Sequence, residues 1–112
     1  MKKKREVGKK NLKQNLVQSQ KPKRKVYTSS KYDKNLEKRI KQIPTLKEEV
    51  QDFLHYLKNR KPIPSKYKNH PLKGKMKGIW DSHIRDDMVL TYEYDESSIY
   101  LIDIGTHSKL RL

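Results

Sequence analysis

The sequence predicts an α+β domain in which two consecutive amphipathic helices pack on a small antiparallel sheet. Three observations support this fold class. Apolar residues recur with a helical period between residues 30 and 57, and with a strand-like period between residues 79 and 104. A stretch containing prolines and glycines, residues 60–78, separates the two regions. The resulting order, β-α-α-β-β-β, is typical of helices segregated to one face of an antiparallel sheet.

The first expected elements are a strand and a helix. Residues 25–29 (KVYTS) favour a short β-strand. Ser29 or Ser30 can then cap a helix, because a hydroxyl at this position accepts a hydrogen bond from a free amide of the first turn. The apolar face of this helix comprises Tyr32, Leu36, Ile40 and Ile43. Pro44 is expected to end it.

A second helix is predicted directly after this proline. Thr45 and Glu48 have the spacing of a capping box. The apolar face that follows comprises Leu46, Val50, Phe53, Leu54 and Leu57. Because the link between the two helices is only one or two residues long, we expect them to form a helical hairpin that ends near Asn59.

The sheet is expected from the C-terminal half. Residues 60–78 should be mostly irregular. Ile79–Ile84 and Met88–Tyr94 read as two strands joined by the polar turn at residues 85–87, and Ile99–Ile104 reads as a strongly apolar third strand that ends at Gly105.

The charge of the chain is unevenly distributed. The 112 residues include 28 Lys or Arg and 13 Asp or Glu, a formal net charge of +15, and only 32% are hydrophobic. Residues 1–25 hold 11 basic residues against one acidic residue, a net +10, which leaves +5 for residues 26–112. We therefore predict that residues 1–24 form a basic, disordered N-terminal extension and residues 25–112 a single domain.

Composition excludes several classes. Without cysteine, the chain has no disulfide framework, thiolate metal site or cysteine nucleophile. No apolar run approaches the ~18 residues of a membrane span, and no apolar stretch follows the basic N-terminus as in a signal peptide. We expect no membrane partner, a cytoplasmic location, and a polyanion as the binding partner.

A basic stretch follows the second predicted helix and contains no acidic residue. It comprises Lys58, Arg60, Lys61, Lys66, Lys68, Lys73, Lys75 and Lys77. Tyr67 and Trp80 lie within or just after it. Cations interleaved with flat aromatic rings suit single-stranded RNA, because phosphates pair with lysine and bases stack on rings. The alternative is a solvated surface loop with Trp80 in the core.

Three of the four histidines are candidates for chemistry, whereas His55 is assigned no role. His70, His83 and His107 lie at the edges of expected strands or loops, close in sequence to Asp81 and Asp87. Imidazoles and carboxylates together can perform general acid–base catalysis near neutral pH. Scattered surface or capping histidines are one alternative. A metal site of Asp81, His83 and His107 is another, but no metal-binding spacing supports it, so no metal or cofactor is predicted.

Three segments resemble the RelE superfamily of bacterial toxins, specifically its YafQ-type branch. They are HPLKGKMKGIWDSHI (70–84), DDMVLTYEY (86–94) and IYLIDIGTHSKL (99–110). The resemblance extends over about residues 25–110. It implies a compact domain like that of microbial ribonucleases, the toxin of a type II toxin–antitoxin system. The implied activity is metal-independent cleavage of mRNA, typically on the ribosome. A cognate antitoxin protein is the implied partner.

The resemblance also implies roles for particular residues. The family's active-site positions correspond to His70, Asp81, His83, Asp87 and His107. His107 would be the general acid, and His83 or Asp81 would be the base or its orienter. His70 and Asp87 would position these groups or the RNA.

Five further residues are expected to bind RNA. They are Lys73, Lys75, Lys77, Trp80 and Arg111. Arg111 stands where the family usually has an aromatic residue, and arginine can both stack on a base and carry charge.

Two rival functions remain. One is a catalytically silent toxin that acts on gyrase, like the related ParE branch, which lacks this histidine set. The other is a non-enzymatic, basic nucleic-acid-binding protein. Replacing the three histidines separates both from a nuclease, because a pure binder would keep its activity.

Overall fold

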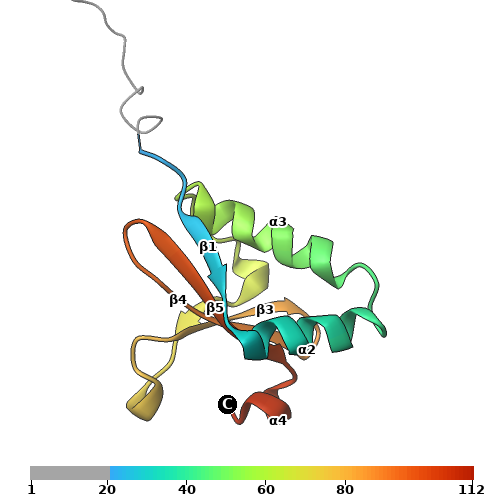
Figure 1. Cartoon of the computed structure of the whole chain (residues 1–112). Helices are drawn as coiled ribbons and strands as arrows, with labels where there is room; N and C mark the ends of the chain where they lie inside the picture. The colour runs from blue at the N-terminus through green and yellow to red at the C-terminus, as the bar shows by residue number, and fades with distance from the viewer. Residues whose placement is uncertain (1–20) are drawn as a thin grey trace, which may run out of the picture.

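The structure, a computed structural model, describes residues 21–112, so the disorder predicted for residues 1–20 lies outside the described part. Five strands form one sheet: β1 (Lys25–Thr28), β2 (His70–Pro71), β3 (Trp80–Arg85), β4 (Met88–Tyr94) and β5 (Ser98–Gly105). Within residues 21–112, three α-helices accompany it: α2 (Ser30–Ile40), α3 (Leu46–Lys58) and α4 (His107–Leu110). Figure 1 shows α2 and α3 running across the sheet. The predicted α+β class is thus confirmed.

The strand order is β1-β5-β4-β3-β2, and one pairing differs from the antiparallel sheet that the sequence predicts. β1 pairs with β5 in parallel, with Val26 opposite Ile99, whereas the other three pairings are antiparallel. A parallel pair cannot be joined by a hairpin and needs a long crossover. Here the chain between β1 and β5, including both long helices, supplies that connection. Apolar periodicity carries no information about strand direction.

Helix α2 begins as the sequence predicts, because the Ser29 hydroxyl accepts a hydrogen bond of 2.9 Å from the amide of Tyr32. It ends at Ile40, three residues before the expected end at Ile43. The amide of Ile43 still donates to the carbonyl of Arg39, and the amide of Leu46 donates to the carbonyl of Ile43. The link between the helices is therefore itself a series of turns.

The predicted capping box at the start of α3 is wrong. Thr45 has backbone angles of φ −86° and ψ 0°, and its side chain makes no capping hydrogen bond. A capping residue needs extended backbone angles so that its side chain can reach the amides of the first turn. The turn that follows α2 imposes helix-like angles on Thr45 instead. Its hydroxyl lies 3.4 Å from the carboxylate of Glu49.

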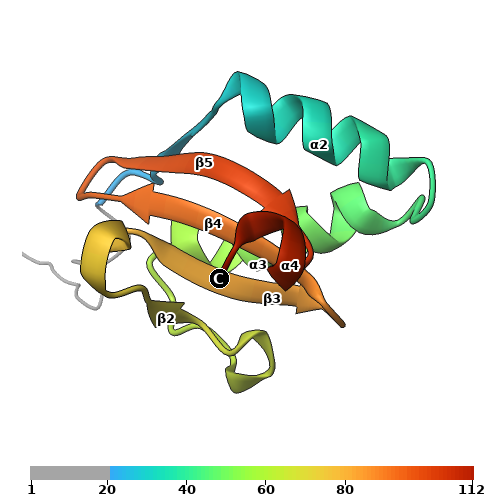
Figure 2. The same ribbon diagram turned by 90° about the horizontal axis from the view of Figure 1, so that it is seen from below.

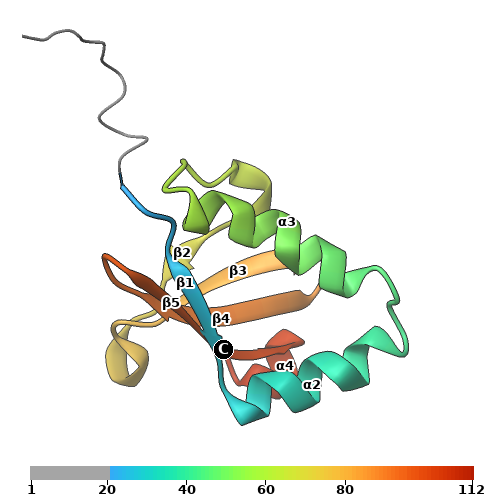
Figure 3. The ribbon, with the colours of Figure 1, turned by 45° about the horizontal axis from the view of Figure 1, so that its top comes forward.

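The core lies between the helices and one face of the sheet. Phe53 on α3 is fully buried, and its ring meets those of Tyr67 and Tyr92 edge-on, with centroids 5.0 and 5.7 Å apart. Leu90 and Ile104 pair across β4 and β5 and are also buried. Edge-to-face aromatic packing adds to the hydrophobic gain of this burial. In Figure 3, α3 runs beside β3 in the upper part of the view, and α2 lies at the lower right, after β1.

Residues 60–78 are more ordered than the sequence suggests. They contain two 3₁₀ turns, η1 (Ser65–Tyr67) and η2 (Gly74–Met76), on either side of β2. The short helix α4 was also not expected. It lies on the sheet face opposite to α3, in front of β3 and β4 in the view of Figure 2. Among residues 21–112, none of the helices combines the length and apolar character needed to cross a membrane.

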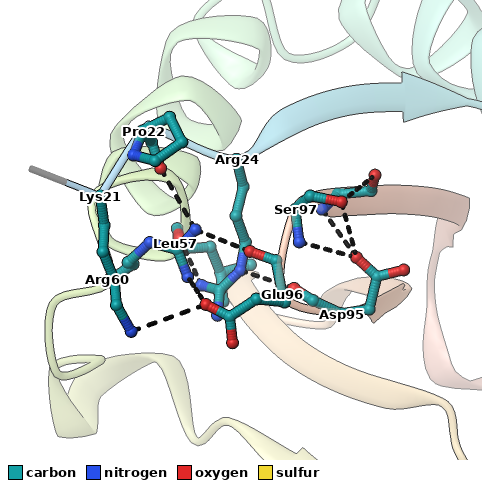
Figure 4. A network of polar contacts seen from close by, with 9 residues as sticks. Lys21, Pro22, Arg24, Leu57, Arg60, Asp95, Glu96 and Ser97 are labelled. Atoms are coloured by element: carbon teal, nitrogen blue, oxygen red, sulfur yellow. Dashed lines mark hydrogen bonds and ion pairs between the residues drawn. The ribbon is translucent and has the colours of Figure 1, made fainter.

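Residues 21–24 are tied to the domain by polar contacts (Figure 4). The Arg24 guanidinium donates to the carbonyls of Leu57 and Asp95, each at 2.8 Å. Arg60 donates to the carbonyl of Pro22 and to the carboxylate and carbonyl of Glu96. These contacts hold the segment before β1 between the end of α3 and the β4–β5 turn.

Candidate active site

His107 and Asp87 form a hydrogen-bonded pair at one end of the sheet. Asp87 lies in the β3–β4 turn, with φ 38°, and His107 opens α4 directly after β5. Nδ1 of His107 lies 2.8 Å from Oδ1 of Asp87, and the backbone N–H of His107 donates to the same oxygen at 3.0 Å. These two hydrogen bonds lower the pKa of Asp87. With Nδ1 donating to a carboxylate, Nε2 of His107 is left for proton exchange.

His83 lies beside this pair. The ring centroids of His83 and His107 are 4.9 Å apart, with 58° between the ring planes. Burial on β3, together with the neighbouring His107, lowers the pKa of His83. At neutral pH this ring is therefore neutral and able to accept a proton.

Asp81 is a buried carboxylate that lacks a hydrogen-bond donor on one oxygen. Its side chain is 3% exposed, and Oδ1 lies 3.1 Å from Nδ1 of His70. That Nδ1 instead makes its hydrogen bond to the carbonyl of Lys68, at 2.9 Å. Oδ1 of Asp81 has no hydrogen-bond partner among residues 21–112. Burial raises the pKa of Asp81, against the opposing influence of the three nearby histidines, of which His70 is the strongest.

His70 faces Asp81 because the two residues are cross-strand partners between β2 and β3. Directly opposed residues of an antiparallel pair project to the same face of the sheet. Two residues of one strand share a face at every second position, which places Asp81 and His83 together as well. The structure thus brings all five predicted catalytic positions to one region: His70, Asp81, His83, Asp87 and His107.

Two hollows border the His83–His107 pair, one lined by His107 and the other by His83. The first has a volume of about 380 Å³ and is lined by His70, Asp81 and His107, by the cations Lys73 and Arg111, and by the apolar side chains of Leu72, Met76 and Leu112. The second, of about 460 Å³, is lined by His83 and by the cations Lys66, Lys68 and Arg85. Carboxylates of Glu49, Asp52 and Asp86 also line the second hollow.

The five predicted RNA-binding residues do not all lie at this site. Lys73 and Arg111 line the first hollow. Lys75 and Lys77 are exposed in and just after η2 and line neither hollow. Trp80 is half-buried, packs against the core, and has its ring 5.9 Å from that of Tyr94. Since Trp80 precedes Asp81 on β3, it projects to the opposite face.

Sequence reasoning missed several residues near the site. Lys66 and Lys68 were recognised as part of a basic stretch but not as neighbours of His83. A cluster of cations just upstream of His70 was the available signal. Asn69 carried no signal at all, because its partners lie 13 and 23 residues away. Within residues 21–112, no three His, Asp or Glu side chains are grouped so that they could hold a metal ion.

A match to a family model gives the class of the protein, the toxins of bacterial type II toxin–antitoxin systems. Residues 24–112 match the model of the family described as "Bacterial toxin of type II toxin-antitoxin system, YafQ". Because this match covers most of the chain, the protein belongs to the YafQ toxin family.

Similar proteins of known sequence or structure agree with this membership. The chain is 37% identical over 54 residues to the mRNA interferase toxin YafQ of Escherichia coli strain K12, which is 48% of this chain and 59% of that relative. The match thus spans about 59% of the curated relative's length. A metal-bound toxin from Helicobacter pylori is similar at 34% identity and TM-score 0.70, covering 77% of this chain and 97% of that one. The E. coli DinJ–YafQ toxin–antitoxin complex is similar at 29% identity and TM-score 0.68, covering 79% and 97%.

Proposed function

We propose that this protein is an endoribonuclease that cleaves mRNA and thereby inhibits translation, as the toxin of a type II toxin–antitoxin system. The observation that carries the proposal is the His107–Asp87 pair beside His83, at a hollow lined by Asp81 and the cations Lys73 and Arg111. The name "mRNA interferase toxin" of the E. coli relative supports it. The action takes place in the cytoplasm, on mRNA engaged by the ribosome.

The proposed reaction is an acid–base cleavage of the RNA backbone. A base removes the proton from a ribose 2′-hydroxyl, whose oxygen then forms a bond to the adjacent phosphorus. The bond from phosphorus to the 5′ oxygen breaks, and an acid protonates that oxygen. The products are a 2′,3′-cyclic phosphate and a 5′-hydroxyl. The reaction needs proton-transfer groups and cations, and this site offers both.

Each side chain has a role that follows from its surroundings. His107, oriented by Asp87, donates the proton from Nε2. His83 is neutral at pH 7 because its pKa is lowered, and it accepts the proton of the 2′-hydroxyl, or Asp81 does so. Lys73 and Arg111 hold phosphate charge that grows in the transition state. Lys75 and Lys77 contact the RNA outside the hollow.

The role of His107 is tested by primer extension on mRNA after induction, with the wild type and His107→Ala compared. Loss of a general acid slows such reactions by roughly 10²–10⁴-fold, so cleavage products should nearly vanish while RNA affinity remains. His55→Ala is the matched control, because His55 is exposed on α3 and outside both hollows. Unchanged cleavage by His107→Ala would refute the role assigned to His107, whereas absence of cleavage by the wild type would favour a non-enzymatic binder or a silent gyrase-directed toxin.

The proposed protein partner is a small acidic antitoxin whose segment covers the lysine-rich face. The toxin–antitoxin complex of the E. coli relative supports this partner, as does the net +5 of residues 26–112. Purification together with the product of the adjacent small open reading frame should yield a complex at physiological salt. Replacing Lys73, Lys75 and Lys77 by Gln should weaken it. The control replaces the exposed Lys34, Lys38 and Lys41, which lie on α2 and at its C-terminal cap. It removes the same charge and should leave the complex intact. Failure to isolate any complex would contradict the proposal.

A further inference from the structure

The carboxamide of Asn69 is the acceptor for two buried hydroxyl groups behind the candidate site. Ser82 Oγ donates to Oδ1 of Asn69 at 2.6 Å, and the Tyr92 hydroxyl donates to the same oxygen. Ser82 and Tyr92 are both fully buried. Burial raises the pKa of Tyr92, so its hydroxyl keeps its proton and remains a donor at any physiological pH.

These hydrogen bonds hold the start of β2, the strand that carries His70, on the core face of the sheet, which is opposite to the face of the candidate site. His70 is the cross-strand partner of Asp81, so the preceding residue, Asn69, lies opposite Ser82 on the core face. The residue before that, Lys68, has left-handed backbone angles of φ 46° and ψ 43°. Its carbonyl accepts the hydrogen bond from Nδ1 of His70 at 2.9 Å. Position and tautomer of the His70 ring thus both depend on the path of residues 68–70.

Little else holds these residues in place. β2 is only two residues long, and both of its residues are exposed. On the other side, the buried Tyr67 ring anchors η1 against Phe53. Between these points, the side chain of His70 contacts Asp81 of β3, and the two hydroxyl contacts of Asn69 connect this segment to both β3 and β4.

We infer that Asn69 is a positioning residue for the reaction, acting through His70. By accepting from Ser82 and Tyr92, it sets the left-handed turn at Lys68, which keeps Nδ1 of His70 on the Lys68 carbonyl and leaves Nε2 free toward the first hollow. Asn69 itself touches no reacting atom. The inference rests on the proposed function, in which His70 positions the catalytic groups or the RNA.

The test compares Asn69→Leu with Asn69→Asp. Leucine removes the acceptor, whereas aspartate keeps an oxygen for both hydroxyls. A displacement of about 1 Å at a catalytic group can cost up to ~10²-fold in rate. We therefore expect kcat of Asn69→Leu to fall by roughly 10- to 100-fold with little change in the KM for RNA. Asn69→Asp should stay within about threefold of the wild type.

A control variant separates the loss of His70 positioning from a general loss of protein stability. Asn35 on α2 donates to the buried Asp103 at 2.6 Å, and neither residue lines either hollow. Asn35→Leu should lower the melting temperature without the fall in kcat. If Asn69→Leu does not fold, Ser82→Ala combined with Tyr92→Phe removes the same two hydrogen bonds and should show the same loss of kcat.

Nitrogen NMR of the His70 ring gives a readout that is independent of catalysis. In the wild type, neutral His70 should carry its proton on Nδ1, and Asn69→Leu should shift it toward the mixture of a free imidazole. An unchanged tautomer, an unchanged kcat in Asn69→Leu, or an equal loss in Asn35→Leu would overturn the inference. Absence of RNA cleavage by the wild type would instead overturn the proposed function, while the tautomer shift would still test the role of Asn69.

Discussion

At the scale of single residues, the carboxylates of the domain differ in the hydrogen bonds that they receive. Asp87 receives two hydrogen bonds from His107, and Asp103 receives hydrogen bonds from Asn35 and from the amide of Ile104. Asp81 is buried like Asp103, yet its Oδ1 lacks a hydrogen-bond donor within residues 21–112. A buried carboxylate without donors costs folding free energy and is suited to proton transfer.

Asp81→Asn should therefore unfold at a temperature equal to or above that of the wild type at pH 7. The folded pKa of Asp81 is raised above the ordinary value of 3.8, so folding favours its protonated form. The stability that the protonated carboxyl contributes is fully present below about pH 3.8, and it is lost as the pH rises through the raised pKa. The advantage of asparagine should consequently shrink in acid. Thermal unfolding followed by circular dichroism, at pH 7 and in acid below about pH 3.8, measures the difference in melting temperature between Asp81→Asn and the wild type.

Asp103→Asn is the matched control for this prediction. Asp103 is also buried, but it has donors and an ion pair of 3.5 Å with Lys31. Its replacement should lower the melting temperature at pH 7. A lower melting temperature for Asp81→Asn at pH 7 would contradict the assignment of Asp81 as an unsatisfied carboxylate.

Some residues of the site could be predicted from the sequence and others could not. The histidines and aspartates were predicted because they form a pattern along the chain and have chemistry of their own. Trp80 was expected near the RNA, but alternation along β3 places it on the face opposite to Asp81. Asn69 has no reactive group, and its importance appears only when Ser82 and Tyr92 are folded against it.

At the scale of elements, α3 supports the site through its aromatic contacts. Phe53 packs against Tyr67, which belongs to η1, and against Tyr92 on β4. Tyr67 closely precedes Asn69 in the sequence, and the Tyr92 hydroxyl donates to the Asn69 carboxamide. Core packing and the position of residues 68–70 are therefore linked.

Phe53→Ala should destabilise the protein by about 3–5 kcal/mol, because it removes a fully buried ring and leaves a cavity. That is a large share of the ~5–15 kcal/mol by which a typical domain is stable. Urea unfolding measures the loss. Tyr27→Ala is the control, since Tyr27 is 50% exposed on the edge strand β1, and it should cost about 1 kcal/mol or less. Equal losses for the two variants would contradict the described core.

Prediction succeeded best for elements with a strong local pattern. β4 has the predicted bounds, and β3 and β5 differ from prediction by one residue at each end. The Ser29 cap is confirmed because it depends on neighbours in sequence. The Thr45 cap failed because the preceding turn sets its backbone angles. The two-residue β2 is too short for any periodicity and exists only because β3 offers it a partner.

At the scale of the whole molecule, residues 21–24 and the candidate site lie at opposite ends of the sheet. Arg24 and Arg60 hold the segment before β1 near the β4–β5 turn, whereas Asp87 and His107 lie where β4 begins and β5 ends. The eight residues of β5 span roughly 25 Å. The extension therefore starts far from the hollow, and we expect it to add a separate contact to RNA or the ribosome.

Neutralising the extension should weaken RNA binding and flatten its dependence on salt, with no change in cleavage site. The variant replaces seven basic residues by Gln in the full chain: Lys2, Lys3, Lys4, Arg5, Lys9, Lys10 and Lys13. For single strands, the slope of log K against log salt falls by about 0.7 for each phosphate that the protein no longer neutralises. Filter binding over a salt series gives this slope.

The control for this variant replaces Gln14, Gln18 and Gln20 by Ala, which alters the extension without altering its charge. Its salt dependence should equal that of the wild type. A neutralised variant with an undiminished slope would show that residues 1–20 do not release counterions from RNA.

The sequence by itself determined the longer helices and strands, which of their faces are apolar, where the charge lies and which side chains can do chemistry. These properties are local, because they depend on periodicity and on residue type. The tertiary structure alone decided the parallel pairing of β1 with β5, the strand β2, and the donors that each carboxylate receives. Such features depend on contacts between residues far apart in the chain, as when Asn69, the neighbour of His70, accepts a hydrogen bond from Tyr92.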